Sequence, residues 1–261
     1  NYKMMLSILG KTFIITAFLM LFPACVGFYY GNDNFISFLV PVAILLAIGA
    51  PLSLMKIKDK SMYAKEGFVT VALAWIFISL IGALPFVISG EIPNYINAFF
   101  ETVSGFTTTG ASILSDVEVL SESMMFWRLF THWIGGMGVL VFVMVLTGLD
   151  RKNTMHLMRA EVPGPEKDKL VPKMTDTARI LYGMYFVLTL IEVILLHFGG
   201  MNLFDSLIHS FSTAGTGGFA WNAEGLGGYS SYIQIVVTVF MILFGINFNC
   251  FYLIMLRHFK D

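Results

Sequence analysis

Six long apolar stretches limit how this chain can fold more than any other feature. A helix needs about 20 predominantly apolar residues to cross a bilayer. Charged residues make up 13% of the chain, against roughly 25% in soluble domains, so the composition fits a lipid environment. We therefore predict an all-α polytopic membrane protein whose six transmembrane helices lie at 12–30, 36–55, 68–89, 125–148, 180–198 and 231–256.

The distribution of lysine and arginine predicts the orientation. With the N-terminus in the cytoplasm and six crossings, 15 of the 16 basic residues fall on the cytoplasmic side and only Arg128 lies outside. This agrees with the excess of positive charge on the inner side of membrane proteins. Both ends of the chain are then cytoplasmic. The net charge of −1 offers no basic field for a nucleic-acid partner.

Two shorter apolar segments, 95–106 and 203–213, are too brief to cross the membrane. Both fall in external connections, so we expect each to enter the membrane and return from the same side as a re-entrant pore helix. A shift of 108 positions pairs Ser104, Thr108 and Gly110 of SGFTTTGAS with their identical counterparts in HSFSTAGTGGFA. The same shift pairs Asn97 with Asp205, and we expect each to cap its short helix.

The Thr/Gly segments that follow the short helices carry hydroxyls and backbone but no charge. Non-helical backbone at membrane depth is tolerated only where it is buried in protein or lines a watery cavity. Carbonyl rings can replace the hydration shell of a monovalent cation, and glycine allows the backbone angles that aim successive carbonyls the same way. The pattern therefore predicts two filter strands of a cation pore.

Four motifs in their order resemble the Trk/Ktr/HKT superfamily of K⁺ transporters, and in particular its TrkH-type membrane subunits. They are FFETVSGFTTTGAS (99–112), THWIGGMGVLVF (131–142), AEVPGPEKDKLVPKMTDTARIL (160–181) and HSFSTAGTGGF (209–219). The resemblance implies K⁺ uptake across the plasma membrane (the bacterial inner membrane), with no enzymatic activity and no cofactor besides the transported K⁺. It places the ion against a filter of mainly backbone carbonyls from Thr108, Thr109, Gly110, Ala111, Thr216, Gly217, Gly218 and Phe219.

The same resemblance suggests how the chain is organised and what it contacts. We expect an N-terminal helix pair (1–64), a first helix–pore loop–helix repeat (65–152), a cytoplasmic linker (153–178) and a second repeat (179–261). The expected partners are membrane lipid, a second copy in a homodimer, and a cytoplasmic ring of TrkA-like nucleotide-binding regulatory subunits. Alternatives are a non-conducting scaffold or sensor that keeps the fold, and a Na⁺-conducting relative, although Na⁺-preferring members tend to have serine where Gly110 stands.

One departure from the family pattern concerns the number of repeats. The family surrounds its ion with four pore loops, and this sequence contains two. Either the sequence is the N-terminal half of a longer protein, which we favour, or two half-size chains assemble.

Several polar or small residues in the apolar segments have two possible roles. Glu101 and its counterpart His209 either attract cations or, as we favour, fix their pore helices by hydrogen bonds. Arg128 is expected to form a surface pair with Glu122 or to extend to the membrane surface. Glu192 either faces a watery vestibule or bonds a neighbouring helix. A fourth group, Gly135, Gly136 and Gly138, is expected to allow close helix packing.

Overall fold

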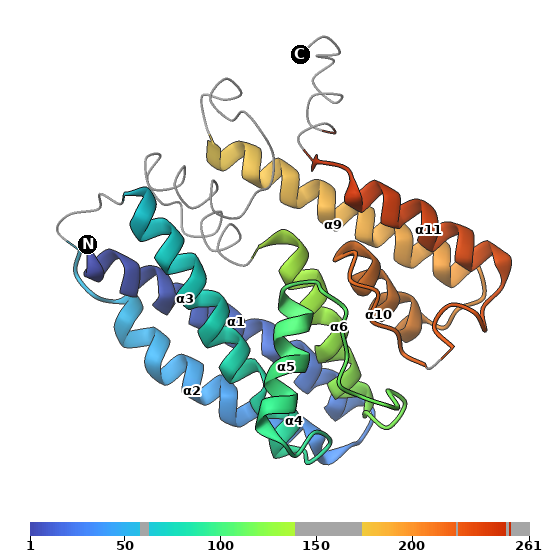
Figure 1. The fold of residues 1–261 in the computed structure, drawn as a ribbon, viewed down its shortest axis with the longest axis horizontal. Coiled ribbons are helices and arrows are strands. Elements are labelled where there is room, and N and C mark those ends of the chain that lie inside the picture. The colour runs from blue at the N-terminus through green and yellow to red at the C-terminus, as the bar shows by residue number, and fades with distance from the viewer. Residues whose placement is uncertain (58–62, 139–173, 223, 249–250, 252–261) are drawn as a thin grey trace, which may run out of the picture.

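The computed structural model describes residues 1–57, 63–138, 174–222, 224–248 and 251, and every regular element in these ranges is a helix (Figure 1). The prediction of an all-α fold is confirmed. The filter segments, predicted as strands, have no regular secondary structure. The elements are α1 (Tyr2–Tyr29), the short 3-10 helix η1 (Asp33–Phe35), α2 (Ile36–Ser53), α3 (Ala64–Gly82), α4 (Leu84–Ile88), α5 (Tyr95–Phe106), α6 (Glu122–Met137), α9 (Met174–Phe198), α10 (Leu203–Ala214) and α11 (Ser231–Gly245).

Four helical stretches in the described ranges are long and apolar enough to cross a membrane: Tyr2–Tyr29, Ile36–Ser53, Lys65–Ile88 and Arg179–Phe198. The other two predicted spans, 125–148 and 231–256, run into residues outside the described ranges. Most of the predicted linker 153–178 also lies outside them. The total of six spans and the four-part division therefore stay predictions.

Two of the predicted spans are wrong as single continuous helices. The span 125–148 is interrupted where α6 ends, because Gly138 has a φ of +70°, and 231–256 is interrupted at Ile246, which is extended. The span 68–89 is confirmed as part of the apolar helical stretch Lys65–Ile88, which has a short break at Ala83 between α3 and α4. Pro85 explains this last break, since it has no N–H for the preceding turn, and the nearby Gly82 carbonyl accepts a 2.9 Å hydrogen bond from the Trp127 indole.

The first two helices pack through a pair of glycines. A Cβ added at Gly10 would lie 2.8 Å from the Gly49 carbonyl oxygen, and one added at Gly49 would lie 2.9 Å from the Gly10 carbonyl oxygen. Small residues that let two backbones touch in this way are typical of helix association in membranes. This contact fixes the N-terminal helix pair.

Helix α6 occupies the centre of the molecule. It packs against α1, α5 and α10 (Figure 1), and eleven of its sixteen residues are buried. On one side the rings of Phe38 and Phe106 meet Trp127 edge to face. On the other side, α9 and α11 run alongside each other around a second core that contains Tyr185 and Phe244. The first and second repeats therefore meet along α6 and α10.

Candidate functional site

Each short helix belongs to a loop whose two ends lie together. In the first loop, Glu91 lies before α5 and accepts hydrogen bonds from the Ser121 amide (2.9 Å) and hydroxyl (2.6 Å), just before α6. In the second, the Tyr229 hydroxyl bonds the Asp205 carboxylate at 3.5 Å. The chain therefore leaves each loop at the end where it entered, which is the geometry a re-entrant segment needs.

The two short helices are twelve residues long and begin in the same way. Asn94 accepts from the Asn97 amide (3.3 Å) and Asn202 accepts from the Asp205 amide (2.7 Å). The prediction that Asn97 and Asp205 are the caps is wrong, because they lie three residues inside the helices and supply the amides that are capped. The true caps are again 108 positions apart.

The turns that end the two helices use the same backbone hydrogen bonds. Each turn makes an i→i−4, an i→i−3 and an i→i−5 bond in succession, and every atom pair recurs 108 positions later. The bonds run Thr107 to Val103 (2.8 Å), Thr108 to Gly105 (3.0 Å) and Thr109 to Ser104 (2.9 Å), and then Gly215 to Phe211 (3.2 Å), Thr216 to Thr213 (2.8 Å) and Gly217 to Ser212 (3.3 Å).

The segments after these turns alternate the sign of φ. Thr108 and Thr216 have φ of +54° and +53°, and they are the non-glycine residues with positive φ in the described ranges. Gly110 and Gly218 follow at +75° and +81°, while the residues between stay negative. A left-handed threonine costs about 1–2 kcal/mol, and such strain persists only where surrounding structure enforces it. Alternating φ turns neighbouring peptide planes, so that successive carbonyls need not point to opposite sides.

The two segments touch at one point. A Cβ added at Gly110 would collide with the carbonyl oxygen of Gly217, whereas nothing lies within 4 Å of a Cβ added at Gly218. Gly110 is therefore required by both conformation and space, and Gly218 by conformation alone.

Glu101 holds the chain just after the first segment. The buried carboxylate accepts from the Ser112 hydroxyl and the Ile113 amide, both at 2.9 Å. The favoured role of Glu101, fixing its surroundings by hydrogen bonds, is confirmed. It also pairs with Arg128, whose Nε lies 2.6 Å from a Glu101 oxygen.

Arg128 is the main correction to the sequence analysis. Its side chain is only 2% exposed, and its ion-pair partner is Glu101, so the expectation of a surface pair with Glu122 is wrong. The guanidinium also donates to the Ala220 carbonyl at 3.1 Å and stacks over the Phe219 ring, 3.6 Å from its centroid. The sequence signal was present, because a single arginine in an apolar segment must find a buried partner.

His132, four residues after Arg128 in α6, packs against the second segment. Its ring stacks on the Phe219 ring with centroids 4.1 Å apart and planes 19° apart, and its Nδ1 lies 3.4 Å from the Ser212 hydroxyl. A Cβ added at Gly217 would collide with the imidazole. His132 therefore packs directly behind the predicted filter, a role that sequence reasoning missed.

The glycines at the end of α6 pack as predicted. An added Cβ at Gly135 would collide with the Phe106 carbonyl, and one at Gly136 would lie 3.1 Å from the Gly215 Cα. Both loops therefore approach α6 backbone to backbone. Gly138 differs, since its role is to end the helix.

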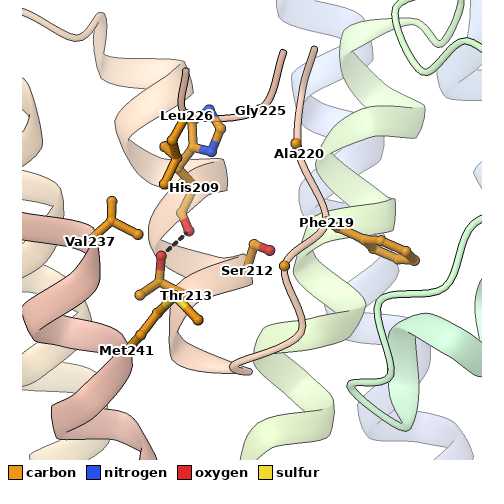
Figure 2. Close-up of a pocket in the computed structure, with 10 residues that line it drawn as sticks. His209, Ser212, Thr213, Phe219, Ala220, Gly225, Leu226, Val237 and Met241 are labelled. Atoms are coloured by element: carbon orange, nitrogen blue, oxygen red, sulfur yellow. Dashed lines mark hydrogen bonds between the residues drawn. The ribbon is translucent and has the colours of Figure 1, made fainter. Parts of the chain in front are cut away.

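Behind the second segment the structure is hollow. A cavity of about 220 Å³ lies between α10, the segment and α11, and its walls include His209, Thr213 and Met241 (Figure 2). Buried His209 has no hydrogen-bond partner for Nε2 among the described residues, so the hydrogen-bonding role favoured for it is not found. The Thr213 hydroxyl donates to the His209 carbonyl at 2.9 Å. The two repeats therefore differ at the Glu101/His209 position.

All eight residues predicted to bind K⁺ lie in the two segments, four in each, and the segments meet where Gly110 faces Gly217. In the described ranges, no group of three or more His, Cys, Asp or Glu residues is arranged to hold a metal ion.

Comparison with known proteins gives consistent matches. The TrkH family model, described as cation transport protein, matches residues 35–260. The Trk system potassium uptake protein TrkH of Escherichia coli K12 is 35% identical over 254 residues, which cover 95% of this chain and 52% of the relative. The Trk system potassium uptake protein TrkG of the same organism is 33% identical, over 91% of this chain and 50% of the relative.

A solved structure extends the match to the fold. The crystal structure of the potassium transporter TrkH from Vibrio parahaemolyticus superposes with a TM-score of 0.77 at 28% identity, covering 93% of this chain and 49% of that chain. The chain thus spans about half the length of the relatives it matches. In the described ranges the fold is all-helical, and four of its helical stretches are long and apolar enough to cross a membrane. The chain belongs to the TrkH family of cation transport proteins.

Proposed function

We propose that the two loop segments are part of a selectivity filter through which a Trk-type system takes up K⁺. The observation that carries this proposal is the alternation of φ along both segments. In each segment φ is positive at a threonine (Thr108 or Thr216), negative at the next residue, and positive again at a glycine (Gly110 or Gly218). Strain at equivalent positions of two loops is unexpected unless the direction of their carbonyls matters. The family membership and the names of the relatives support the same function.

In this proposal K⁺ exchanges its water shell for carbonyl oxygens of Thr108–Ala111 and Thr216–Phe219. The pore helices α5 and α10 end at these segments, so the negative ends of their dipoles favour a cation there. The membrane potential drives entry, at about 2.3 kcal/mol per charge for each 100 mV. The selective step is then dehydration.

The setting of the filter is part of the proposal. We place the protein in the bacterial inner membrane with the described N-terminal end in the cytoplasm, as a homodimer that docks a nucleotide-binding regulatory ring through the segment 153–178. The four-part division of the chain is proposed together with this assembly. A Na⁺-conducting relative and a non-conducting scaffold are the competing functions.

Rubidium uptake by cells that lack their own K⁺ uptake tests this proposal. Expression of the native protein with its regulator should restore growth at low K⁺ and Rb⁺ uptake. Gly218→Ser has room for its side chain, so it should fold and shift the preference toward Na⁺, and Gly110→Ser should do so with a larger loss of folded protein. Failure of the native protein to transport Rb⁺ supports the scaffold, and equal Na⁺ and Rb⁺ uptake supports the Na⁺-conducting alternative.

A further inference from the structure

We infer that Arg128 is a positioning residue that links the two filter segments and sets their spacing, and through it the discrimination between K⁺ and Na⁺. The inference rests on the proposed function. The side chain comes from α6, which lies between the two pore helices α5 and α10. It reaches both segments at their outer ends.

On the first repeat, Arg128 acts through Glu101. The guanidinium Nε donates to Glu101 Oε1 at 2.6 Å, and the same carboxylate binds the Ser112 hydroxyl and the Ile113 amide. Two donors of the returning chain and one of α6 thus converge on one buried carboxylate. Moving Arg128 would move Glu101, and with it the chain just after Ala111.

On the second repeat, Arg128 acts directly. Nη1 donates to the Ala220 carbonyl at 3.1 Å, and the guanidinium carbon lies over the Phe219 ring, 3.6 Å from its centroid. The same ring stacks on the His132 ring. The chain just after Gly218 is therefore fixed by a hydrogen bond and by the contacts of Phe219 with Arg128 and His132.

This link occurs once in the two repeats. Counted from Ser121 and Ser230, which precede the two helices, the position equivalent to Arg128 in α11 is Val237. The counterparts of Glu101 and Ser112 are His209 and Ala220. The second repeat thus has neither the arginine nor the carboxylate nor the hydroxyl that would let it fix its own segment. The segment of the second repeat is instead bound by Arg128 of the first repeat. The cavity lies between His209 and Ala220, the counterparts of Glu101 and Ser112.

Stability alone is a poor explanation of such a buried pair. Desolvation offsets much of the attraction, and well-packed apolar replacements of buried ion pairs are often neutral or stabilising. What the guanidinium supplies is a rigid plane that points separate donors in fixed directions. A lysine ammonium at the same position keeps the charge but lacks this plane, so charge and geometry can be separated by experiment.

The test compares Arg128→Lys and the double variant Arg128→Leu/Glu101→Leu with the native protein. Rb⁺ and Na⁺ uptake gives the selectivity ratio, and the melting temperature in detergent with K⁺ or with Na⁺ reports cation-specific binding. We expect both variants to fold and to lose about tenfold in the selectivity ratio, the equivalent of one charge-assisted hydrogen bond. If the lysine variant fails to fold, the double variant decides, because no unpaired buried charge remains in it.

Trp127→Phe is the matched control. It removes the buried hydrogen bond to Gly82 from the neighbouring position of α6, so it should lower the melting temperature and leave the selectivity ratio unchanged. Folded Arg128 variants with the native ratio would overturn the inference while leaving the proposed function intact. A native protein without Rb⁺ uptake and without K⁺-specific stabilisation would overturn both.

Discussion

Gly110 and Gly217 touch backbone to backbone, so that a methyl group on Gly110 would occupy the space of the Gly217 carbonyl oxygen. At Gly218, with a similar positive φ of +81°, the same methyl group would enter open space. Two glycines at equivalent positions of the repeat are therefore under different constraints, and alanine substitutions can measure the difference.

We expect Gly218→Ala to cost about 1–2 kcal/mol, because only the left-handed backbone opposes it. Gly110→Ala should cost about 1–3 kcal/mol more than Gly218→Ala, because the second segment must also move aside. Thermal unfolding of the two variants in detergent would show the order. Equal losses would mean that the segments do not meet at Gly110.

The ring of His132 should matter more than its nitrogen atoms. His132→Phe keeps the stack on Phe219 and gives up the contact with Ser212, so it should cost about 1 kcal/mol. His132→Ala leaves a void between α6 and the second segment, at a cost of about 3 kcal/mol or more. Melting temperatures of the two variants would compare them. A phenylalanine variant as unstable as the alanine variant would show that the polar contact dominates.

The closure of the first loop should depend on pH. Burial of the Glu91 carboxyl raises its pKa above the ordinary 4.5, with a further contribution from Glu122, although hydrogen bonds from Ser121 oppose the rise. A raised pKa means that the folded state binds the proton more tightly than the unfolded state, so this group stabilises the fold below pH 4.5 and the contribution is lost as pH rises through the folded pKa.

Glu91→Gln should therefore show a smaller decline in melting temperature above pH 4.5 than the native protein. The amide can still accept from Ser121, so the loop should remain closed. Melting curves at several pH values would give the two slopes, and parallel slopes would show that Glu91 does not contribute.

Glu192 offers a test of charge at membrane depth. It is fully buried, and neither carboxylate oxygen has a hydrogen-bond partner among the described residues. A charge without a partner in such a place is very costly, so we infer a neutral carboxylic acid. Glu192→Gln should then preserve folding and Rb⁺ uptake, while Glu192→Lys should prevent folding. Expression and size-exclusion profiles distinguish these outcomes, and an unfolded glutamine variant would argue for an ionised carboxylate.

The short helices were predicted closely because their limits are local. The segments 95–106 and 203–213 were expected, and the structure has Tyr95–Phe106 and Leu203–Ala214. Each begins at an asparagine whose side chain caps the first turn, and each ends where threonine and glycine take left-handed angles. These signals lie within a few residues of the boundaries they set, although the predicted capping residues lie three positions after the true ones.

Arg128 and the breaks in the long helices were not predicted, because they depend on partners that are distant in sequence. Glu101 is 27 residues before Arg128 and Ala220 is 92 residues after it. Periodicity cannot show which of several polar groups a buried arginine meets. Similarly, the residues 68–89 form one apolar run, so their sequence does not indicate that α3 ends at Gly82, where the Trp127 indole donates to the Gly82 carbonyl.

The register of the two repeats also separates the parts of each loop that can change length during evolution from the parts that cannot. From the capping asparagines Asn94 and Asn202 to Gly110 and Gly218, the two copies match without an insertion or deletion. The next helices are preceded by Ser121 and Ser230, which are 109 positions apart, so the second returning chain is one residue longer. In homologous proteins, these loops should accordingly vary in length after the positions of Gly110 and Gly218 and stay constant before them.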